Sequence, residues 1–269
     1  MNSIFSNMIP IFFAAMGGLF TALAGTLNIA LEGLLLISAF TSLTVFYFSG
    51  SITLAIIAAI MAAMTMALFH VFAAFRLRAN VFISGLAINL FSSGLCIVLS
   101  DKLFKTKGVV TANNTPSLLI LYLVIGTILL FAAWLTIYKT PFGYRLRACE
   151  KNTAALVSLG IKPQNYQTAA ILISGFFCGI GGSFLSLNLN AYVPGMSAGK
   201  GWIALAVIFL GARKPVGILA AALVFAAAEN LSNYAQGFLQ IPADFILAFP
   251  YICALIAIIA VSAVSREVK

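Results

Sequence analysis

The sequence predicts an all-α integral membrane protein with about nine transmembrane segments (roughly eight to ten) in a single transmembrane domain over residues 1–269. Hydrophobic residues make up 62% of the chain and charged residues only 8%, whereas soluble domains carry about 25% charged residues. The mean hydropathy is +1.10. A water-soluble globule of this size could not bury so much apolar surface. The composition therefore excludes a soluble hydrolase, and the length leaves no room for an additional ATPase domain.

Apolar runs of about 20 residues mark the individual membrane helices. Such runs lie at 8–24, 28–48, 51–75, 80–99, 117–138, 168–188 and 244–264. A further apolar stretch, 201–231, is interrupted by Arg213, Lys214 and Pro215. The interruption divides it into 202–212 and 215–231, which completes the nine segments. The piece 202–212 is long enough to cross part of the bilayer, unless its ends lie within protein.

Basic residues orient these segments, because Lys and Arg collect in cytoplasmic loops. If 139–166 is cytoplasmic, alternation places 11 of the 15 Lys and Arg inside. The four outside are Lys102, Lys105, Lys107 and Lys200. This bias predicts an N-terminus outside and a C-terminus inside. The net charge of +9 is thus interpreted as an orientation signal, and no nucleic-acid partner is expected.

Two stretches of the sequence repeat one another. Gly-Gly-x-Phe occurs at 17–20 and at 181–184, and each is followed by Ile-Ala-Leu at the start of the next apolar run, at 29–31 and 203–205. In the predicted topology the two copies enter from opposite sides, so we expect two inverted repeats. Inverted repeats are typical of transport folds, with the substrate route between the halves. Chance similarity between apolar runs is the alternative.

Two carboxylates, Glu32 and Glu229, lie within apolar runs. Each would cost about 2.5–3.5 kcal/mol at the bilayer centre, so each needs a partner, water or a pore. Asn28 precedes Glu32 by one helical turn, which predicts a shared polar face beside a translocation path. The alternative for Glu32 is a hydrogen bond to neighbouring backbone that shapes the fold. Glu229 is expected either at the outer mouth or along the route.

Two further residues are candidates for the same path. Asn89 lies in the middle of the run 80–99, where it either joins helices or lines the route. Trp202 opens the run 202–212 and offers an aromatic face for stacking on a ring-bearing solute.

The most polar predicted cytoplasmic stretch is 139–166. Asn152 can cap a short helix over 153–159, Gly160 is a natural C-terminal stop, and Pro163 hinders continuation. A short, partly apolar helix between two spans either lies on the membrane surface or binds a partner. We expect this short helix to be a coupling element that binds a partner protein.

The sequence contains no catalytic constellation. HExxH and GxSxG motifs are absent, and the Gly-Lys-Gly at 199–201 lacks the first glycine and the Ser or Thr of a phosphate-binding loop. The four cysteines (Cys96, Cys149, Cys178 and Cys253) show no metal-ligand spacing. We therefore expect a non-enzymatic chain with free thiols and no metal.

Three motifs together resemble a known family. They are GGLFTALAGTLNIALEGLLLISAF (17–40), TPFGYRLRACEKNTAALVSLGI (140–161) and PGMSAGKGWIALAVIFLGARKP (194–215). They resemble the permease subunits of bacterial ABC importers, in the branch for branched-chain amino acids, simple sugars and nucleosides, and most of all the nucleoside-type permeases. The resemblance spans nearly the whole chain. It implies a multi-pass protein of the bacterial cytoplasmic membrane.

The resemblance also implies partners. These are cytoplasmic ATPase subunits that bind the ATP, a second permease that is identical or homologous, and an external substrate-binding lipoprotein; the permease itself would hold no cofactor. An ATPase-docking helix would fall on about Arg147 to Ile161. The coupling residues implied there are Arg147, Ala148, Glu150, Asn152, Ala155, Gly160 and Ile161. The family's Gly-Glu-Asn-Pro-like run differs here, because Lys151 stands in place of the acid and Glu150 lies one position earlier.

These observations lead to an importer permease for a nucleoside or a simple sugar, or another ring compound such as riboflavin. The alternative is a proton-coupled secondary transporter with Glu32 or Glu229 as the proton carrier. That alternative predicts uptake that collapses with an uncoupler and does not depend on 139–166. A membrane-embedded enzyme has no supporting residues.

Overall fold

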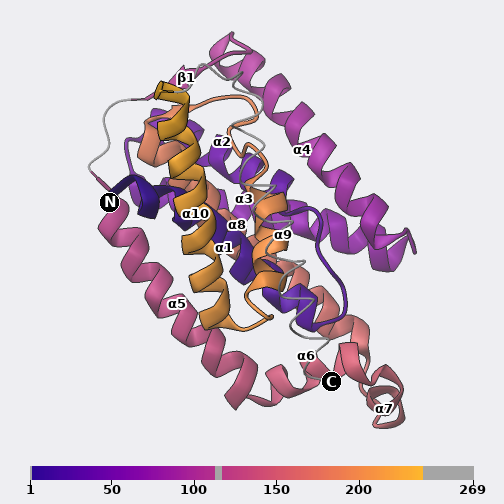
Figure 1. Cartoon of the computed structure of the whole chain (residues 1–269). Helices are drawn as coiled ribbons and strands as arrows, with labels where there is room; N and C mark the ends of the chain where they lie inside the picture. Colours follow the sequence, from indigo (N-terminus) through magenta and orange to yellow (C-terminus); the bar gives the residue numbers. More distant parts are fainter. Residues whose placement is uncertain (1, 113–116, 239–269) are drawn as a thin grey trace.

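The computed structural model describes residues 2–112 and 117–238, and in this part the chain is a bundle of helices with one very short β-ribbon (Figure 1). The helices are α1 (Asn2–Leu23), α2 (Leu31–Ser49), α3 (Ile52–Val71), α4 (Val81–Phe104), α5 (Leu119–Lys139), α6 (Pro141–Lys151), α7 (Thr153–Ser158), α8 (Pro163–Leu189), α9 (Lys200–Leu210) and α10 (Pro215–Phe238). A π-helical turn, Phe72–Arg76, extends α3. The strands β1 (Val110–Thr111) and β2 (Ala191–Tyr192) pair antiparallel.

The predicted all-α membrane class is confirmed. Within the described residues, 7 helices are long and apolar enough to cross a membrane, and α9, with 11 residues, is shorter. These eight helices correspond to eight of the predicted segments. The ninth, 244–264, lies outside the described residues, so the total span count stays a prediction.

Local sequence signals fix the ends of several helices. The Asn80 side chain accepts hydrogen bonds from the backbone N–H of Phe82 and Ile83, at 2.9 and 3.3 Å, and so caps α4. Gly50 ends α2 in the left-handed conformation, with φ +65°. Pro163 and Pro215 open α8 and α10, where a missing N–H costs nothing.

Helices α1, α2 and α8 form the buried centre of the bundle. Small residues let them approach closely: a Cβ on Gly17 would lie 2.8 Å from the Cα of Ser174. By contrast, α4 and α5 expose apolar side chains such as Leu90 and Ile120, which are 77% and 75% exposed. Such exposure suits contact with lipid, so α4 and α5 lie at the periphery.

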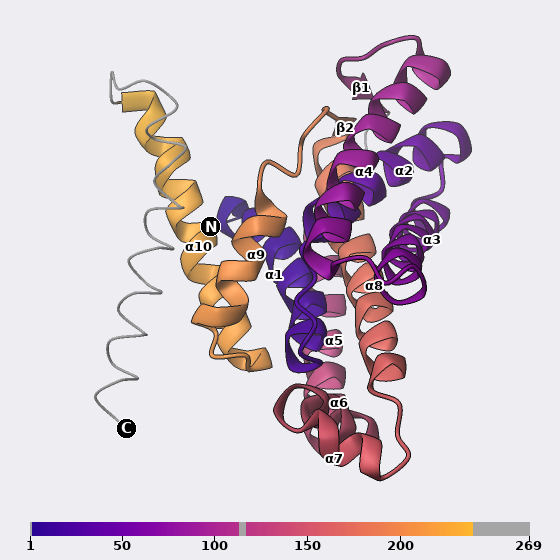
Figure 2. The same cartoon turned by 90° about the vertical axis from the view of Figure 1, so that its right-hand side faces the viewer.

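The two ends of the bundle carry different features. Helices α6 and α7 lie at one end and the β1–β2 ribbon at the opposite end (Figure 2). The α9–α10 connection belongs to the α6–α7 end, because Arg213 pairs with Glu150. This placement groups Arg213 and Lys214 with the 139–166 loop, as the charge pattern predicts. The orientation relative to the bilayer and the inverted symmetry of the halves stay predictions.

Candidate functional site

The first turn of α9 lies inside the bundle. The chain leaves β2, turns inward through 193–199 and starts α9 well away from the β1–β2 end (Figure 2). Lys200, the first residue of α9, is only 8% exposed. A helix that begins within a membrane protein brings unpaired backbone N–H groups into an apolar interior, where each needs a partner.

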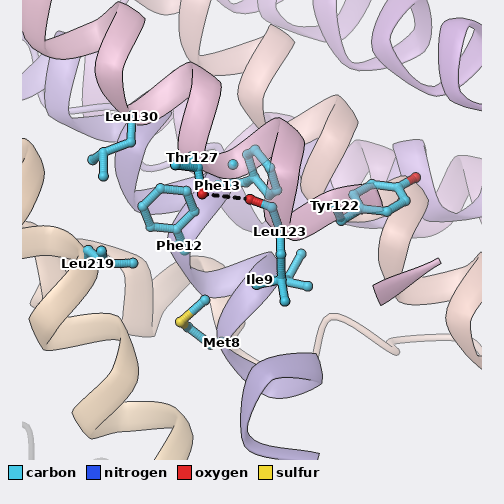
Figure 3. A pocket seen from close by; sticks show the side chains of 10 residues that line it. Met8, Ile9, Phe12, Phe13, Tyr122, Leu123, Thr127, Leu130 and Leu219 are labelled. Atoms are coloured by element: carbon cyan, nitrogen blue, oxygen red, sulfur yellow. Dashed lines mark hydrogen bonds between the residues drawn. The ribbon is translucent and has the colours of Figure 1, made fainter. Parts of the chain in front are cut away.

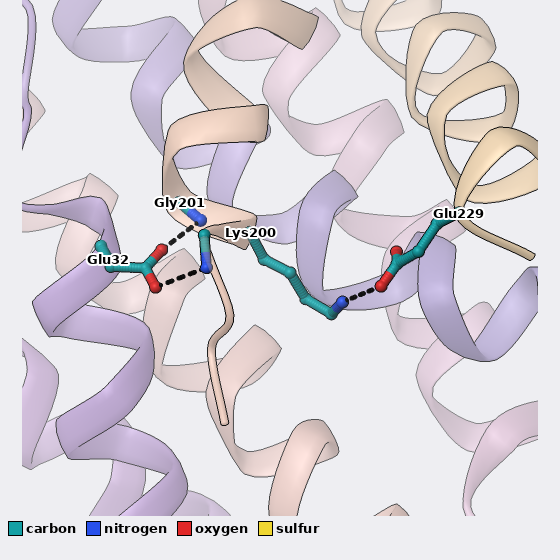
Figure 4. A network of polar contacts seen from close by, with 5 residues as sticks. Glu32, Lys200, Gly201 and Glu229 are labelled. Carbon is teal, nitrogen blue, oxygen red and sulfur yellow. Dashed lines mark hydrogen bonds and ion pairs between the residues drawn. The ribbon is translucent and has the colours of Figure 1, made fainter. Parts of the chain in front are cut away.

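Glu32 supplies that partner from α2. Its Oε1 accepts a hydrogen bond from the Gly199 N–H at 2.9 Å, and its Oε2 accepts one from the Gly201 N–H at 2.7 Å (Figure 4). The carboxylate also faces the positive end of the helix dipole. Glu32 therefore bonds to backbone, as one interpretation of the sequence proposed. The backbone belongs to a distant segment and not to neighbouring residues.

The first turns of α2 and α9 touch directly. A Cβ on Gly201 would overlap the backbone N and Cα of Glu32. Glycine at 201 thus allows the two helix starts to meet at backbone distance.

Glu229 approaches the same turn from α10. It forms an ion pair with Lys200, and the two side chains are 20% and 9% exposed (Figure 4). The two membrane carboxylates, which the sequence could not connect, therefore converge on one turn of α9. We call Glu32, Gly199, Lys200, Gly201 and Glu229 the α9 clamp.

The sequence-based interpretation of Lys200 as an outer-loop cation missed the ion pair. Hydropathy does not reveal a loop that folds back into the protein. A usable signal was available, since a lysine between two glycines at the start of an apolar run can be buried only beside an acid.

The predicted shared face of Asn28 and Glu32 is wrong. α2 begins at Leu31, and Asn28 lies in the non-helical connection before it. Its Oδ1 accepts from the Ala30 N–H at 2.9 Å, a local turn that competes with helix formation. Its Nδ2 donates to Ser174 Oγ at 2.7 Å, so Asn28 is fully buried against α8.

Asn89 accepts a hydrogen bond from a backbone N–H at the start of α2, as Glu32 does at the start of α9. Its Oδ1 accepts from the Gly33 N–H at 2.8 Å, and its Nδ2 donates to the Ile29 carbonyl at 3.0 Å. Asn89 thus joins α4 to the start of α2. Trp202 lies apart from this network and is 41% exposed on a face of α9 that also carries Phe209.

We expect Asn89→Ala to destabilise the protein by about 1–3 kcal/mol, because two hydrogen bonds at a helix start are lost. Thermal unfolding of the purified protein in detergent should show a lower midpoint. Leu90→Ala is the matched control, since Leu90 is exposed on the same helix. An Asn89→Ala midpoint equal to that of the control would contradict this assignment.

Helix α7 stands at the α6–α7 end. As the sequence predicts, Asn152 caps it, with Oδ1 accepting from the Ala155 N–H at 3.0 Å, and Gly160 follows with φ +73°. The helix expected on about Arg147 to Ile161 is two helices, because the backbone breaks at Asn152 (φ −152°, ψ 72°). Val157 and Leu159 project outward, at 60% and 74% exposed.

The other coupling residues that the resemblance implies have internal contacts. The Arg147 guanidinium lies over the rings of Tyr138 and Tyr144, at 5.2 and 5.1 Å. The Ala148 carbonyl accepts from the Asn152 N–H at 2.9 Å, and the Ile161 N–H donates to the Leu156 carbonyl at 3.0 Å. These contacts shape the α6–α7 turn.

An open recess lies where the α6–α7 end meets the helix bundle. It has an empty volume of about 830 Å³. The lining residues are Ala22, Gly25, Leu27, Phe82, Cys149, Glu150, Thr153, Gln167, Phe209 and Arg213. Burial raises the pKa of the Cys149 thiol, so this cysteine stays protonated at neutral pH.

A second, apolar pocket lies between α1, α5 and α10 (Figure 3). Phe12, Phe13 and Leu219 contribute to its wall. The hydroxyl of Thr127 donates to the Leu123 carbonyl at 2.9 Å, and that of Tyr122 bonds to Ser183 at 2.7 Å. Its polar groups are thus engaged within the protein, so the pocket suits an apolar occupant better than a polar solute. Among the described residues, no three His, Cys, Asp and Glu side chains gather as a metal site would require.

A bundle of helices long and apolar enough to cross a membrane, with charged groups buried at a helix start, defines a multi-pass membrane protein. The chain belongs to the family described as branched-chain amino acid transport system / permease component, whose model matches residues 1–261. The resemblance seen in the sequence is thereby confirmed. The chain is an ABC transporter permease subunit of the cytoplasmic membrane, and ATP hydrolysis in such transporters belongs to partner subunits.

Curated relatives agree with this assignment. The guanosine ABC transporter permease protein NupQ of Bacillus subtilis (strain 168) is 31% identical, over 93% of this chain and 87% of the relative. The nucleoside ABC transporter permease protein NupC of Lactococcus lactis subsp. cremoris (strain MG1363) is 28% identical, over 95% and 90%.

Solved structures share the fold. PsaBC from Streptococcus pneumoniae, in complex with Fab, aligns with a TM-score of 0.56 at 13% identity, over 95% of this chain and 89% of that one. An inward-facing metal-chelate type ABC transporter aligns with a TM-score of 0.52 at 15% identity, over 92% and 80%.

Proposed function

We propose that this permease imports nucleosides, with purine nucleosides first. The observation that carries the proposal is the similarity, over more than nine-tenths of the chain, to permeases named for guanosine and for nucleosides. Simple sugars are the second choice, since a relative that is 24% identical bears the name "Putative glucose ABC transporter permease protein TsgC13".

In this proposal a substrate-binding lipoprotein delivers the solute to the β1–β2 end. The predicted outer loops, 100–116 and 189–200, contain the two strands, and Val110 pairs with Tyr192. One surface can therefore receive the binding protein. A second permease, identical or homologous, completes the membrane core.

At the opposite end, ATPase subunits would bind the exposed side of α7, and 139–166 is the coupling segment. ATP binds to those subunits, and the permease needs no cofactor. The movement of the ATPase subunits would reach the α9 clamp, where the first turn of α9 contacts Glu32 of α2 and Glu229 of α10. The substrate route would be bordered, or its surrounding helices positioned, by the side chains of Asn28, Glu32, Asn89, Trp202 and Glu229.

A proton-coupled secondary transporter is the weaker choice. Both oxygens of Glu32 accept hydrogen bonds from backbone N–H groups, and Glu229 is paired with Lys200. These contacts give both carboxylates a structural role at the start of α9, and the relatives of the chain are named as permeases of ABC transporters.

The proposal is tested by uptake into proteoliposomes that contain the permease, its ATPase and its binding protein. We expect ATP-dependent accumulation of labelled guanosine that competing adenosine reduces and that competing glucose leaves unchanged. An uncoupler should have no effect. Uptake without ATPase that collapses with the uncoupler would establish the secondary transporter. ATP-dependent accumulation of labelled glucose, without accumulation of labelled guanosine, would establish a sugar substrate.

A further inference from the structure

Two connections meet at the α6–α7 end of the bundle. One is 24–30, which leads from α1 into α2, and the other is 211–214, which leads from α9 into α10. The helices they serve, α2 and α9, are those whose first turns touch in the α9 clamp. The first connection leads directly into the start of α2, whereas the second follows the C-terminal end of α9, whose 11 residues separate it from the start of that helix.

Glu150 contacts both connections. Its carboxylate forms an ion pair with Arg213 in the second one. In the first, Gly25 has φ +71°, and a Cβ placed there would lie 3.1 Å from the Cα of Glu150. Glycine at 25 thus lets the α1–α2 connection rest against the backbone of α6.

Arg213 is held in an unusual conformation. It and Ala212 are consecutive non-glycine residues with φ +54° and +52°. Such conformations cost of order 1–3 kcal/mol each and persist where the surroundings determine them. The backbone N–H of Arg213 donates to the Ile208 carbonyl at 3.0 Å. The Arg213 side chain adds the ion pair with Glu150 and the stacking of its guanidinium on Phe209, at 5.3 Å.

Glu150 is also next to the exposed helix. It lies in the last turn of α6, two positions before Asn152, which caps α7. A movement of α7 therefore reaches Glu150 through two peptide units. The open recess beside it, which Glu150 and Arg213 both line, gives this part of the chain room to move.

We propose that Glu150 transmits the movement of α7 to both α2 and α9. This inference rests on the proposed function, in which α7 binds the ATPase. Helix α9 is a rod of 11 residues, about 16 Å long. Arg213 follows its C-terminal end, and the α9 clamp holds its first turn. A displacement of Glu150 then acts on the centre of the bundle along α9.

If the ion pair had only a structural role, breaking it would lower the stability of the protein. The two side chains are 39% and 32% exposed, and exposed pairs add little to stability. Breaking the pair should therefore leave the fold and the ATPase contact intact. Its effect should fall on transport.

The test compares Glu150→Arg, Arg213→Glu and the double charge exchange in the full complex. Lys214→Glu is the matched control, because it makes the same charge change at the neighbouring position. Three quantities are measured: co-purification of the ATPase, ATP hydrolysis stimulated by the binding protein, and nucleoside uptake per ATP. Thermal unfolding checks that each variant is folded.

We expect each single variant to bind the ATPase as the unmodified protein does and to lose uptake per ATP by about tenfold, a loss typical of coupling between sites. The double exchange should recover most of the loss, because the ion pair is restored in reverse. The control should transport normally. Normal transport by both single variants, or a double exchange no better than either, would overturn the inference. Failure of the unmodified permease to bind the ATPase would instead overturn the proposed function and this inference with it.

Discussion

Glu32→Ala is expected to abolish uptake and to lower the thermal midpoint strongly. The carboxylate accepts hydrogen bonds from the N–H groups of Gly199 and Gly201. A hydrogen bond to a charged group contributes about 1.5–3 kcal/mol, so two contribute about 3–6 kcal/mol. Their loss leaves the backbone N–H groups at the start of α9 without partners inside the bundle. The free energy lost is a large fraction of the stability of a folded protein.

Glu32→Gln separates charge from hydrogen bonding. Its amide keeps one acceptor oxygen and loses the negative charge at the helix start, so we expect an intermediate midpoint and reduced uptake. Thermal unfolding in detergent and uptake into proteoliposomes measure the two effects. An alanine variant as stable as the unmodified protein would contradict the capping role of Glu32. Retained, uncoupler-sensitive uptake in the glutamine variant would contradict ATP-driven import.

Much of the fold could be predicted because the bilayer imposes its length on each helix. Apolar runs locate α3, α4 and α5, whose exposed side chains suit contact with lipid. Local signals also suffice at Asn152 and Gly160, where a side-chain cap and a left-handed glycine involve neighbouring residues alone. Such features depend on a few consecutive positions, which a single sequence displays.

The α9 clamp could be predicted only in part. Glu32 and Glu229 stood out because isolated carboxylates are costly in a membrane, but their partners lie far away in the sequence. The Glu32–Gly201 contact joins positions 169 residues apart, and no pattern along the chain reports it. The shared helical face of Asn28 and Glu32 was predicted wrongly for a related reason. The local turn at Asn28 and its hydrogen bond to the distant Ser174 keep Asn28 outside α2.

Leu159→Glu together with Val157→Glu is expected to abolish binding of the ATPase while the permease stays folded. Both side chains are exposed at the C-terminal end of α7, at 74% and 60%. Large exposed apolar side chains that lie next to one another are typical of a surface that a partner covers. Burial of one such side chain contributes about 1.5–3 kcal/mol, so two changes weaken binding by at least about a hundredfold.

Ser158→Glu is the matched control, because it adds a charge to the exposed surface of the same helix without removing an apolar group. Co-purification of the ATPase measures binding, and thermal unfolding of the permease alone measures folding. The buried residue of α7, Leu156, and the Asn152 cap are untouched by these changes, so the midpoint should stay constant. Undiminished ATPase binding by the double variant would place the docking surface elsewhere. A loss as large in the control would show that added charge, and not lost apolar contact, separates the two proteins.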